Sequence, residues 1–214
     1  QGASVDQQDN DGYTPLFVAS LKGHIDAARL LLDAGAAVDK RREGDWSPFG
    51  IACALGQVDV ATLLVERGAD SAAVNMCIGG APPLLFACRN QNLDAMQLCL
   101  EHGADVNWAN EDGQTILWIL CYEGHVDAAR LLLDKGAEVD RATEDGATPL
   151  SIAKRWRRSS IVALLEEHLD SKFPLHAAAR TGDVEAMTQL LDGGAEVDAK
   201  KDGATPLLLS LIHI

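Results

Sequence analysis

Apolar and polar positions follow one another along the chain in blocks that recur about every 33 residues. Each block opens with a short apolar stretch that carries small residues, such as "PLFVASLK" (15–22), and passes through a polar turn. A second apolar run follows, such as "AARLLLDAG" (27–35), and a polar segment leads to the next block. This pattern predicts two helices in each block and a loop between consecutive blocks.

Residues that begin and end helices stand at fixed places in these blocks. Thr14 and Thr148 precede a proline, where a hydroxyl caps backbone N–H groups and proline fits the first helical position. Glycines recur at the reversal between the helices (Gly23, Gly56, Gly124) and after the second helix (Gly35, Gly68, Gly103, Gly136). The permissive backbone of glycine fits both places, so these signals predict where each helix ends.

The spacing of the proline position shows how regular the blocks are. This position is filled by Pro15, Pro48, Pro83, Ile116, Pro149, Pro174 and Pro206, in steps of 33, 35, 33, 33, 25 and 32 residues. The blocks are close copies: "DGYTPLFVASLKGHIDAARLLLDAGAAVD" (11–39) returns as "DGQTILWILCYEGHVDAARLLLDKGAEVD" (112–140). With its T-P-L-H-x-A-like "FPLHAA", the chain resembles ankyrin-repeat proteins over nearly its whole length. The resemblance implies an all-α solenoid of helix-turn-helix-hairpin loop units, each stabilised by contacts with its neighbours.

The repeat pattern also predicts the organisation of the chain. We expect residues 1–8 to end a preceding repeat, and 9–170 to form a first array, with repeats at 9–41, 42–76, 77–109, 110–142 and 143–170. The region 171–208 either continues this stack at an altered angle, which we prefer, or starts a second array. Because the chain begins with Gln1 and ends in "LSLIHI" (209–214), we expect a fragment whose tail is not native.

Two irregularities interrupt the period. Two extra residues lengthen the segment between Gly68 and Pro83, and the hairpin is missing after "LLEEHLD" (164–170). Insertions in loops cost little, so we expect the first to distort one hairpin without breaking the stack. The basic stretch "KRWRRSS" (154–160) precedes the missing hairpin, and we interpret it as a local positive spot at this junction. A nuclear-import signal is the alternative.

Composition narrows the classes of partner. The formal net charge is −14, which argues against nucleic-acid binding because phosphate contacts need a basic surface. No window approaches the roughly 18 uncharged apolar residues that span a bilayer, so we expect no membrane partner. Five cysteines without a CxxC pair fit a reducing compartment. We therefore expect a cytoplasmic location, with a nuclear one as the alternative.

The reactive residue types are dispersed rather than gathered. Cys53, Cys88 and Cys121 occupy one repeat position, which we expect to be small and buried between helices. Five of the six histidines are spread over the repeats, whereas metal or nucleophile chemistry needs convergent side chains. We therefore predict no enzyme activity, no metal site and no cofactor.

Surface recognition is the function that the resemblance implies. In ankyrin-repeat proteins, loop tips and the ends of first helices line a concave binding face. The residues at these positions are Tyr13, Leu21, Lys22, Trp46, Leu55, Ile78, Arg89, Trp108, Gln114, Tyr122, Glu123, Arg155 and Trp156. Trp118 is expected to pack instead. We predict a monomeric scaffold or adaptor for an unidentified protein partner. The alternative is the substrate-recruiting region of a larger enzyme such as a kinase, an acyltransferase or a ubiquitin ligase.

Overall fold

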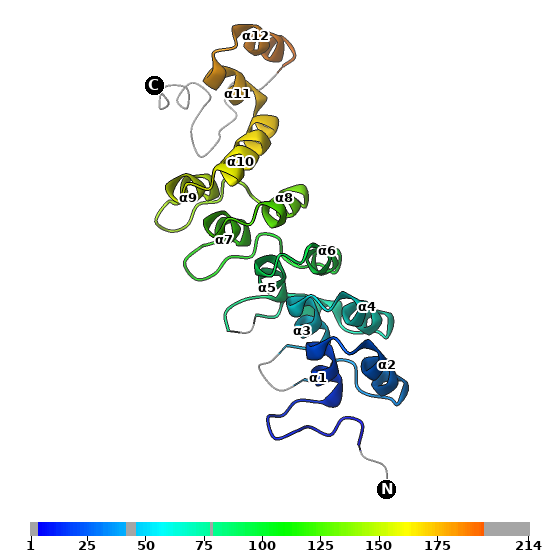
Figure 1. Cartoon of the computed structure of the whole chain (residues 1–214). Coiled ribbons are helices and arrows are strands. Elements are labelled where there is room, and N and C mark those ends of the chain that lie inside the picture. Colours follow the sequence, from blue (N-terminus) through cyan, green and yellow to red (C-terminus); the bar gives the residue numbers. More distant parts are fainter. Residues whose placement is uncertain (1–3, 42–45, 78, 195–214) are drawn as a thin grey trace.

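The structure, a computed structural model, describes residues 4–41, 46–77 and 79–194, which form two layers of helices (Figure 1). The first helices of the repeats are α1 (Pro15–Lys22), α3 (Pro48–Leu55), α5 (Pro83–Arg89), α7 (Ile116–Glu123), α9 (Pro149–Arg155) and α11 (Pro174–Thr181). The second helices are α2 (Ile25–Asp33), α4 (Val58–Glu66), α6 (Leu93–Glu101), α8 (Val126–Asp134), α10 (Ser159–Lys172) and α12 (Val184–Asp192). Over these ranges the architecture is an all-α repeat solenoid, as predicted. The hairpin loops project on the side of the first helices.

Every first helix in the described ranges begins at the predicted proline position. The hydroxyl of Thr14 accepts a hydrogen bond from the N–H of Phe17 at 3.2 Å, and Thr148 caps α9 in the same way. Ser47 and Thr115 cap α3 and α7 equivalently. Such a cap stabilises a helix by about 1 kcal/mol, which helps these four short helices of seven or eight residues to begin at fixed places.

The turn between the two helices of a repeat requires a left-handed residue. Gly56 has φ 74° at this place, whereas the third and fifth repeats carry Gln91 (φ 53°) and Arg157 (φ 55°) there. Within "KRWRRSS", Arg157 therefore occupies the position that glycine fills in other repeats. A left-handed conformation costs a residue with a Cβ atom roughly 1–2 kcal/mol, so both turns are strained relative to the others.

Replacing Arg157 with glycine is therefore expected to stabilise the protein. Arg157→Gly removes the left-handed strain but adds entropy to the unfolded chain, so the free energy of unfolding should rise by about 0.5–1 kcal/mol. Urea denaturation followed by circular dichroism at 222 nm measures this change. Arg157→Ala is the matched control, since it removes the charge and keeps the Cβ atom. Equal stabilities of the two variants would contradict the strain explanation.

One hydrophobic core runs through the stack from Leu16 to Leu169 and Phe173. Cys53, Cys88 and Cys121 are fully buried in it, as predicted, and their small side chains let neighbouring first helices approach closely. Burial raises the pKa of the Cys121 thiol to about 12, so this thiol is protonated at neutral pH. Cys77, in contrast, is exposed.

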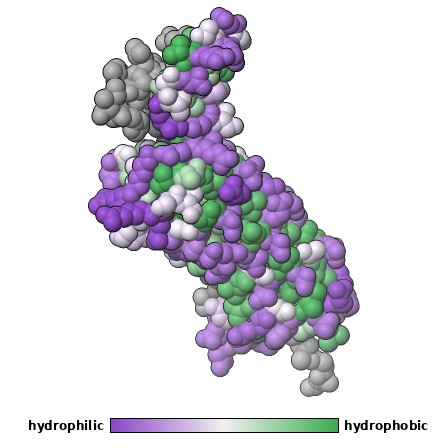
Figure 2. All heavy atoms as spheres, turned by 45° about the horizontal axis from the view of Figure 1, so that its top comes forward, coloured by the Kyte–Doolittle hydropathy of each residue, from purple (hydrophilic) through white to green (hydrophobic). Residues whose placement is uncertain are grey.

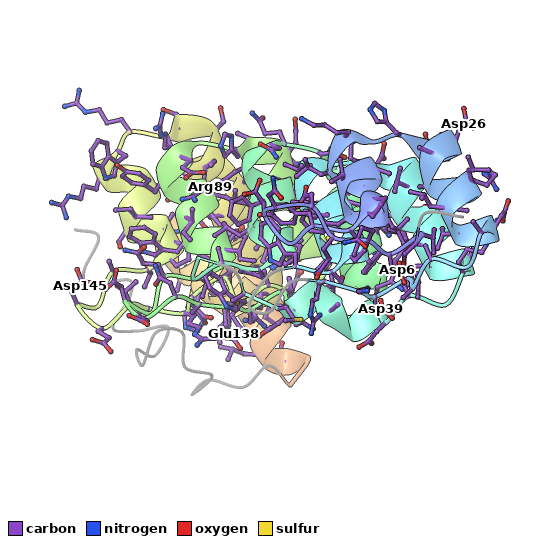
Figure 3. All side chains as sticks on the ribbon, turned by 90° about the horizontal axis from the view of Figure 1, so that it is seen from below. Asp6, Asp26, Asp39, Arg89, Glu138 and Asp145 are labelled. Atoms are coloured by element: carbon purple, nitrogen blue, oxygen red, sulfur yellow. The ribbon has the colours of Figure 1, made fainter. Side chains whose placement is uncertain are left out.

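Hydrogen bonds between consecutive hairpins form a ladder along the stack, and Figure 3 labels three of its residues, Asp6, Asp39 and Glu138. In each rung a side-chain oxygen accepts the backbone N–H of a residue one repeat further on. The rungs are Asp6 to Ala37, Asp39 to Asp70, Asn75 to Asp105 and Asn107 to Glu138, at 2.8–3.2 Å. The ladder therefore fixes the position of each hairpin relative to the next one.

The lengthened segment between Gly68 and Pro83 folds into the 3-10 helix η1 (Ser71–Asn75). It packs against α3 and α5, and these two helices remain in extensive contact with each other. The insertion therefore leaves the stack unbroken at this point, as predicted.

The missing hairpin after the fifth repeat is replaced by helix. Helix α10 has 14 residues, compared with nine in α8, and Phe173 alone separates it from α11. Helix α10 packs against α11, and Arg180 forms an ion pair with Asp170 across the junction. The main core ends at Phe173. The repeat boundaries and the choice between one array and two stay predictions. Pro206 and residues 209–214 lie outside the described residues.

Candidate protein-binding surface

Aromatic side chains gather in two groups on the side of the stack that carries the first helices and the hairpins. We define the N-terminal cluster as Tyr13, Phe17, Trp46 and Phe86, and the aromatic row as Trp118, Tyr122 and Trp156. Both groups contain neighbouring rings with centroids 4.7–6.0 Å apart. They differ in exposure, which decides what each group can do.

The expectation that Trp46 is available to a partner is wrong, because the structure buries this side chain. Trp46 is 7% exposed and packs edge-on against Phe86, with the ring centroids 5.0 Å apart. Its indole N–H donates a hydrogen bond to the carbonyl oxygen of Met76 at 3.0 Å. Met76 follows η1 directly, so the lengthened segment supplies the acceptor that a buried tryptophan needs.

The other residues predicted in the N-terminal repeats form a loose group around this cluster. Tyr13 stacks on Phe17, and Leu21 packs beside them, so both side chains are half-buried. Lys22 and Leu55 are exposed at the ends of α1 and α3. Ile78, the remaining predicted tip residue, lies outside the described residues. The two cavities beside the aromatic row, described below, include none of these N-terminal residues.

The aromatic row crosses from α7 to the end of α9. Trp118 and Tyr122 lie one helical turn apart and are stacked, with an interplanar angle of 12°. Tyr122 meets Trp156 edge-on at 5.0 Å between ring centroids. Tyr122 is 40% exposed and Trp156 is 50% exposed, so the row presents aromatic surface to solvent.

Trp118 packs against the hydrophobic core, as the sequence predicts. It is half-buried and borders cavities on both sides of α7. Its place beside Tyr122 in the aromatic row could be predicted from their spacing of four residues, because such residues share one face of a helix. The indole N–H of Trp118 is buried and has no hydrogen-bond partner among the described residues. An unsatisfied buried donor costs about 1–3 kcal/mol, so packing rather than hydrogen bonding holds this ring.

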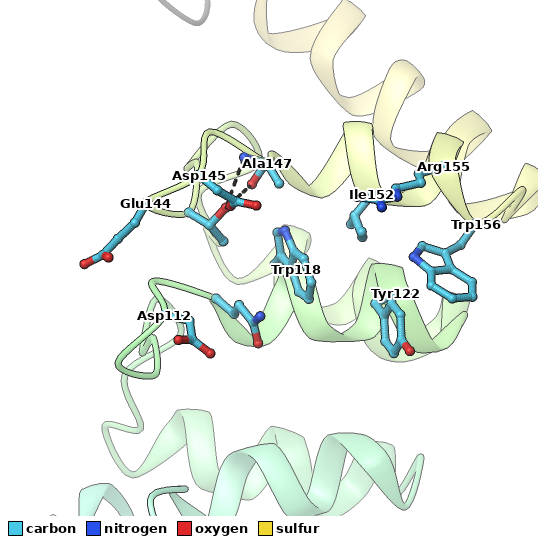
Figure 4. Close-up of a pocket in the computed structure, with 11 residues that line it drawn as sticks. Asp112, Trp118, Tyr122, Glu144, Asp145, Ala147, Ile152, Arg155 and Trp156 are labelled. Carbon is cyan, nitrogen blue, oxygen red and sulfur yellow. Dashed lines mark hydrogen bonds between the residues drawn. The ribbon is translucent and has the colours of Figure 1, made fainter.

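The first cavity, of about 480 Å³, lies between α7 and α9 (Figure 4). Its helical wall consists of the aromatic row with Ile152 and Arg155. The hairpin ends 112–114 and 143–147 close its other side and contribute Asp112, Glu144 and Asp145. The cavity therefore combines aromatic walls with carboxylates at the hairpins and a guanidinium group at the end of α9.

The second cavity, of about 490 Å³, lies between α5 and α7. Trp108 and Gln114 border it, and so does the ion pair in which the Nε–H of Arg89 donates to the carboxylate of Glu123 at 2.9 Å. The two cavities share Gln114, Trp118 and Tyr122. Together they gather seven of the predicted contact residues: Arg89, Trp108, Gln114, Tyr122, Glu123, Arg155 and Trp156.

The Asp145 carboxyl group, at the hairpin end of the first cavity, is stabilised in its ionised form. The Thr143 hydroxyl donates a hydrogen bond to the Asp145 carboxylate, and this bond lowers the pKa of Asp145 below its ordinary value. Desolvation opposes this lowering in part, and individually weaker effects of backbone N–H groups and of Arg155 add to the lowering. Because the pKa is lowered, the negative charge persists at more acidic pH than in an ordinary aspartate.

Over the described residues, no group of three or more histidine, cysteine, aspartate or glutamate side chains is arranged to hold a metal ion. Within the same ranges, none of the helices combines the length and the apolar character needed to cross a membrane.

Comparison with known proteins identifies the repeats. A family model described as "Ankyrin repeats (3 copies)" matches residues 1–75 and 84–171, which is more than half of the chain. A model described as "Ankyrin repeat" matches residues 170–202. No curated protein matches the chain.

Proposed function

Because this chain belongs to the ankyrin-repeat family, whose members are generally protein–protein interaction modules, we propose that it binds a protein partner through the aromatic row. The two cavities beside the row receive side chains of the partner, and the first helices and hairpins hold the row in place. Ankyrin repeats are typically non-catalytic, so the proposed mechanism is recognition alone.

The exposure of the aromatic row carries this proposal. Aromatic residues make up only 5% of the chain, yet Tyr122 and Trp156 lie side by side with about half of each side chain open to solvent. Tryptophan and tyrosine dominate the binding energy of many interfaces, above all when they lie next to pockets. On the face shown in Figure 2, hydrophobic patches lie among hydrophilic residues.

The rigidity of the surroundings supports the same proposal. The Asn107–Glu138 rung and the Arg89–Glu123 ion pair fix the elements next to α7. The Nε–H of Arg158 donates to the carbonyl oxygen of Tyr122 at 3.1 Å and joins α10 to the end of α7. Binding to a surface that is already ordered loses less conformational entropy, so more of the contact energy contributes to affinity.

The alternative role, recruitment of substrates for a larger enzyme, would use the same surface and stays a prediction. The predicted monomeric state and the predicted cytoplasmic or nuclear location also stay predictions. None of them changes how the row would contact a partner.

Affinity capture with variants of the aromatic row tests the proposal. The double variant Tyr122→Ala/Trp156→Ala is expected to lose proteins that the unmodified chain captures from cell extract, because it removes two interface anchors. Loss of one anchor typically costs at least 2 kcal/mol, which lowers affinity about 30-fold. Quantitative mass spectrometry of the captured proteins provides the measurement.

The matched control is Leu30→Ala, which removes another exposed hydrophobic side chain, 70% exposed on α2. The control should capture the same proteins as the unmodified chain. Circular dichroism spectra must agree among all three proteins. If the double variant keeps every captured protein that the control keeps, the aromatic row is not the binding surface.

A further inference from the structure

The first cavity carries an uneven distribution of charge that goes beyond a general protein-binding surface. Its lining contains the carboxylates of Asp112, Glu144 and Asp145 and a single cation, Arg155. The carboxylates come from two neighbouring hairpins, whereas Arg155 lies at the last turn of α9. The hairpin end of the cavity is therefore negative, and the end near α9 is positive.

These carboxylates are available to a ligand. Within the described ranges, no ion pair uses Asp112, Glu144 or Asp145. Two other cations near the end of α9 have partners elsewhere: Lys154 pairs with Glu166 at 2.9 Å, and the Nε–H of Arg158 donates to the backbone of Tyr122. Arg155 acts on Asp145 only as a weak charge without an ion pair, and the Thr143 hydroxyl donates to one Asp145 oxygen, so the negative end of the cavity can still accept a further cation.

Aromatic walls stand beside this negative end. Figure 4 shows Trp118 between the hairpin that carries Asp145 and the helix α7, with Tyr122 and Trp156 further along the cavity. The face of an aromatic ring attracts cations, most strongly in the case of tryptophan, and guanidinium groups stack on such faces. A carboxylate that accepts hydrogen bonds from the same guanidinium strengthens this attraction.

From this arrangement we infer that the cavity between α7 and α9 receives an arginine side chain from a basic segment of the protein partner. The guanidinium group lies against Trp118 and pairs with Asp145 and Asp112. The aliphatic part of the side chain runs along Ile152 and Tyr122, and Trp156 contacts the neighbouring backbone. The inference rests on the proposed function, because it identifies the chemistry that the partner presents to the aromatic row.

The overall charge of the chain agrees with such a partner. The net charge of −14 attracts basic segments at long range, and charge complementarity selects partners and speeds association. Arg155 also determines where the partner's arginine binds. It repels a cation at the α9 end of the cavity, so the guanidinium group binds at the hairpin end. An acidic segment would meet three carboxylates and one guanidinium group and is disfavoured.

Peptide binding to the intact 214-residue chain tests this inference. The probe is a blocked glycine–serine peptide with one central arginine, and its matched control carries neutral, isosteric citrulline at the same position. Titrations followed by 1H–15N spectra report on the indole N–H signals of Trp118 and Trp156. The arginine peptide is expected to shift both signals and to bind at least about fivefold more tightly than the citrulline peptide.

Four charge variants sharpen the test. Asp145→Asn and Asp112→Asn should each weaken arginine binding about two- to fivefold, and Arg155→Gln should tighten it about twofold. Asp26→Asn is the matched control, because it removes one exposed carboxylate at the opposite end of the stack (Figure 3). It should leave the dissociation constant unchanged.

Equal binding of the arginine and citrulline peptides would overturn the inference. Asp26→Asn weakening as large as that of Asp145→Asn would overturn it as well, since binding would then follow net charge alone. Stronger shifts with a glutamate peptide, or with single-stranded RNA, would assign the cavity to another ligand and also overturn it. The proposed function is judged separately: proteins lost on Tyr122→Ala/Trp156→Ala would support it even if the arginine peptide failed.

Discussion

Trp46→Ala is expected to destabilise the protein by roughly 3–5 kcal/mol, although Trp46 lies in a loop before α3. The indole ring fills the space between Phe17, Ile51 and Phe86, and the shortened side chain leaves a cavity there. The carbonyl oxygen of Met76 also loses its donor, which removes one attachment of the lengthened segment after η1. Chemical denaturation followed by circular dichroism at 222 nm measures the loss.

Trp46→Phe is the control for this prediction. It keeps most of the buried ring and removes the donor to Met76, so it should cost only about 1–2 kcal/mol. Unchanged stability of Trp46→Ala would show that Trp46 is a surface residue after all. A loss of binding in Trp46→Ala must therefore be interpreted as unfolding, not as removal of a contact.

Gly56→Ala is expected to destabilise the protein by roughly 2–3 kcal/mol. Gly56 has φ 74°, a conformation that costs residues with a Cβ atom about 1–2 kcal/mol. An added Cβ atom would also lie 2.1 Å from the Nδ2 atom of Asn92. Asn92 must then move, and its side chain caps α6 by accepting the N–H of Ala95 at 2.9 Å, a cap that stabilises by about 1 kcal/mol.

Gly68→Ala separates the two contributions. Gly68 has φ 86°, but an added Cβ atom there has no neighbour within 4 Å. This variant should lose only the 1–2 kcal/mol of backbone strain, so Gly56→Ala should exceed it by about 1 kcal/mol. Urea denaturation of both variants provides the comparison. Equal losses would mean that Asn92 adjusts without giving up its cap.

Much of the fold was predictable because its signals are local. The position of Pro15 and its equivalents predicted the start of every first helix in the described ranges, since a proline and a preceding hydroxyl act within one turn. The burial of Cys53, Cys88 and Cys121 followed from their shared repeat position, since equivalent residues meet equivalent neighbours in a solenoid.

The candidate site was predictable only in part. The repeat register placed Tyr122, Arg155 and Trp156 at the ends of first helices, and the structure brings all three to one cavity. The repeat register also predicted Trp46 at a loop tip and Trp118 in a packing position. It does not show which other segments of the chain cover a residue. An insertion some 30 residues later covers Trp46, and the gap between α7 and α9 opens beside Trp118.

The sequence by itself determined the repeat, the helix boundaries, the buried small residues and the acidic character, because each depends on local spacing or on simple composition. Tertiary structure alone decided which tryptophans face solvent and which carboxylates share a cavity with them. The physical reason is that exposure and charge pairing depend on contacts between repeats, such as Trp46 with Met76 and the grouping of Asp112 with Asp145. Those contacts depend on where loops of different length pack against the regular stack of helices.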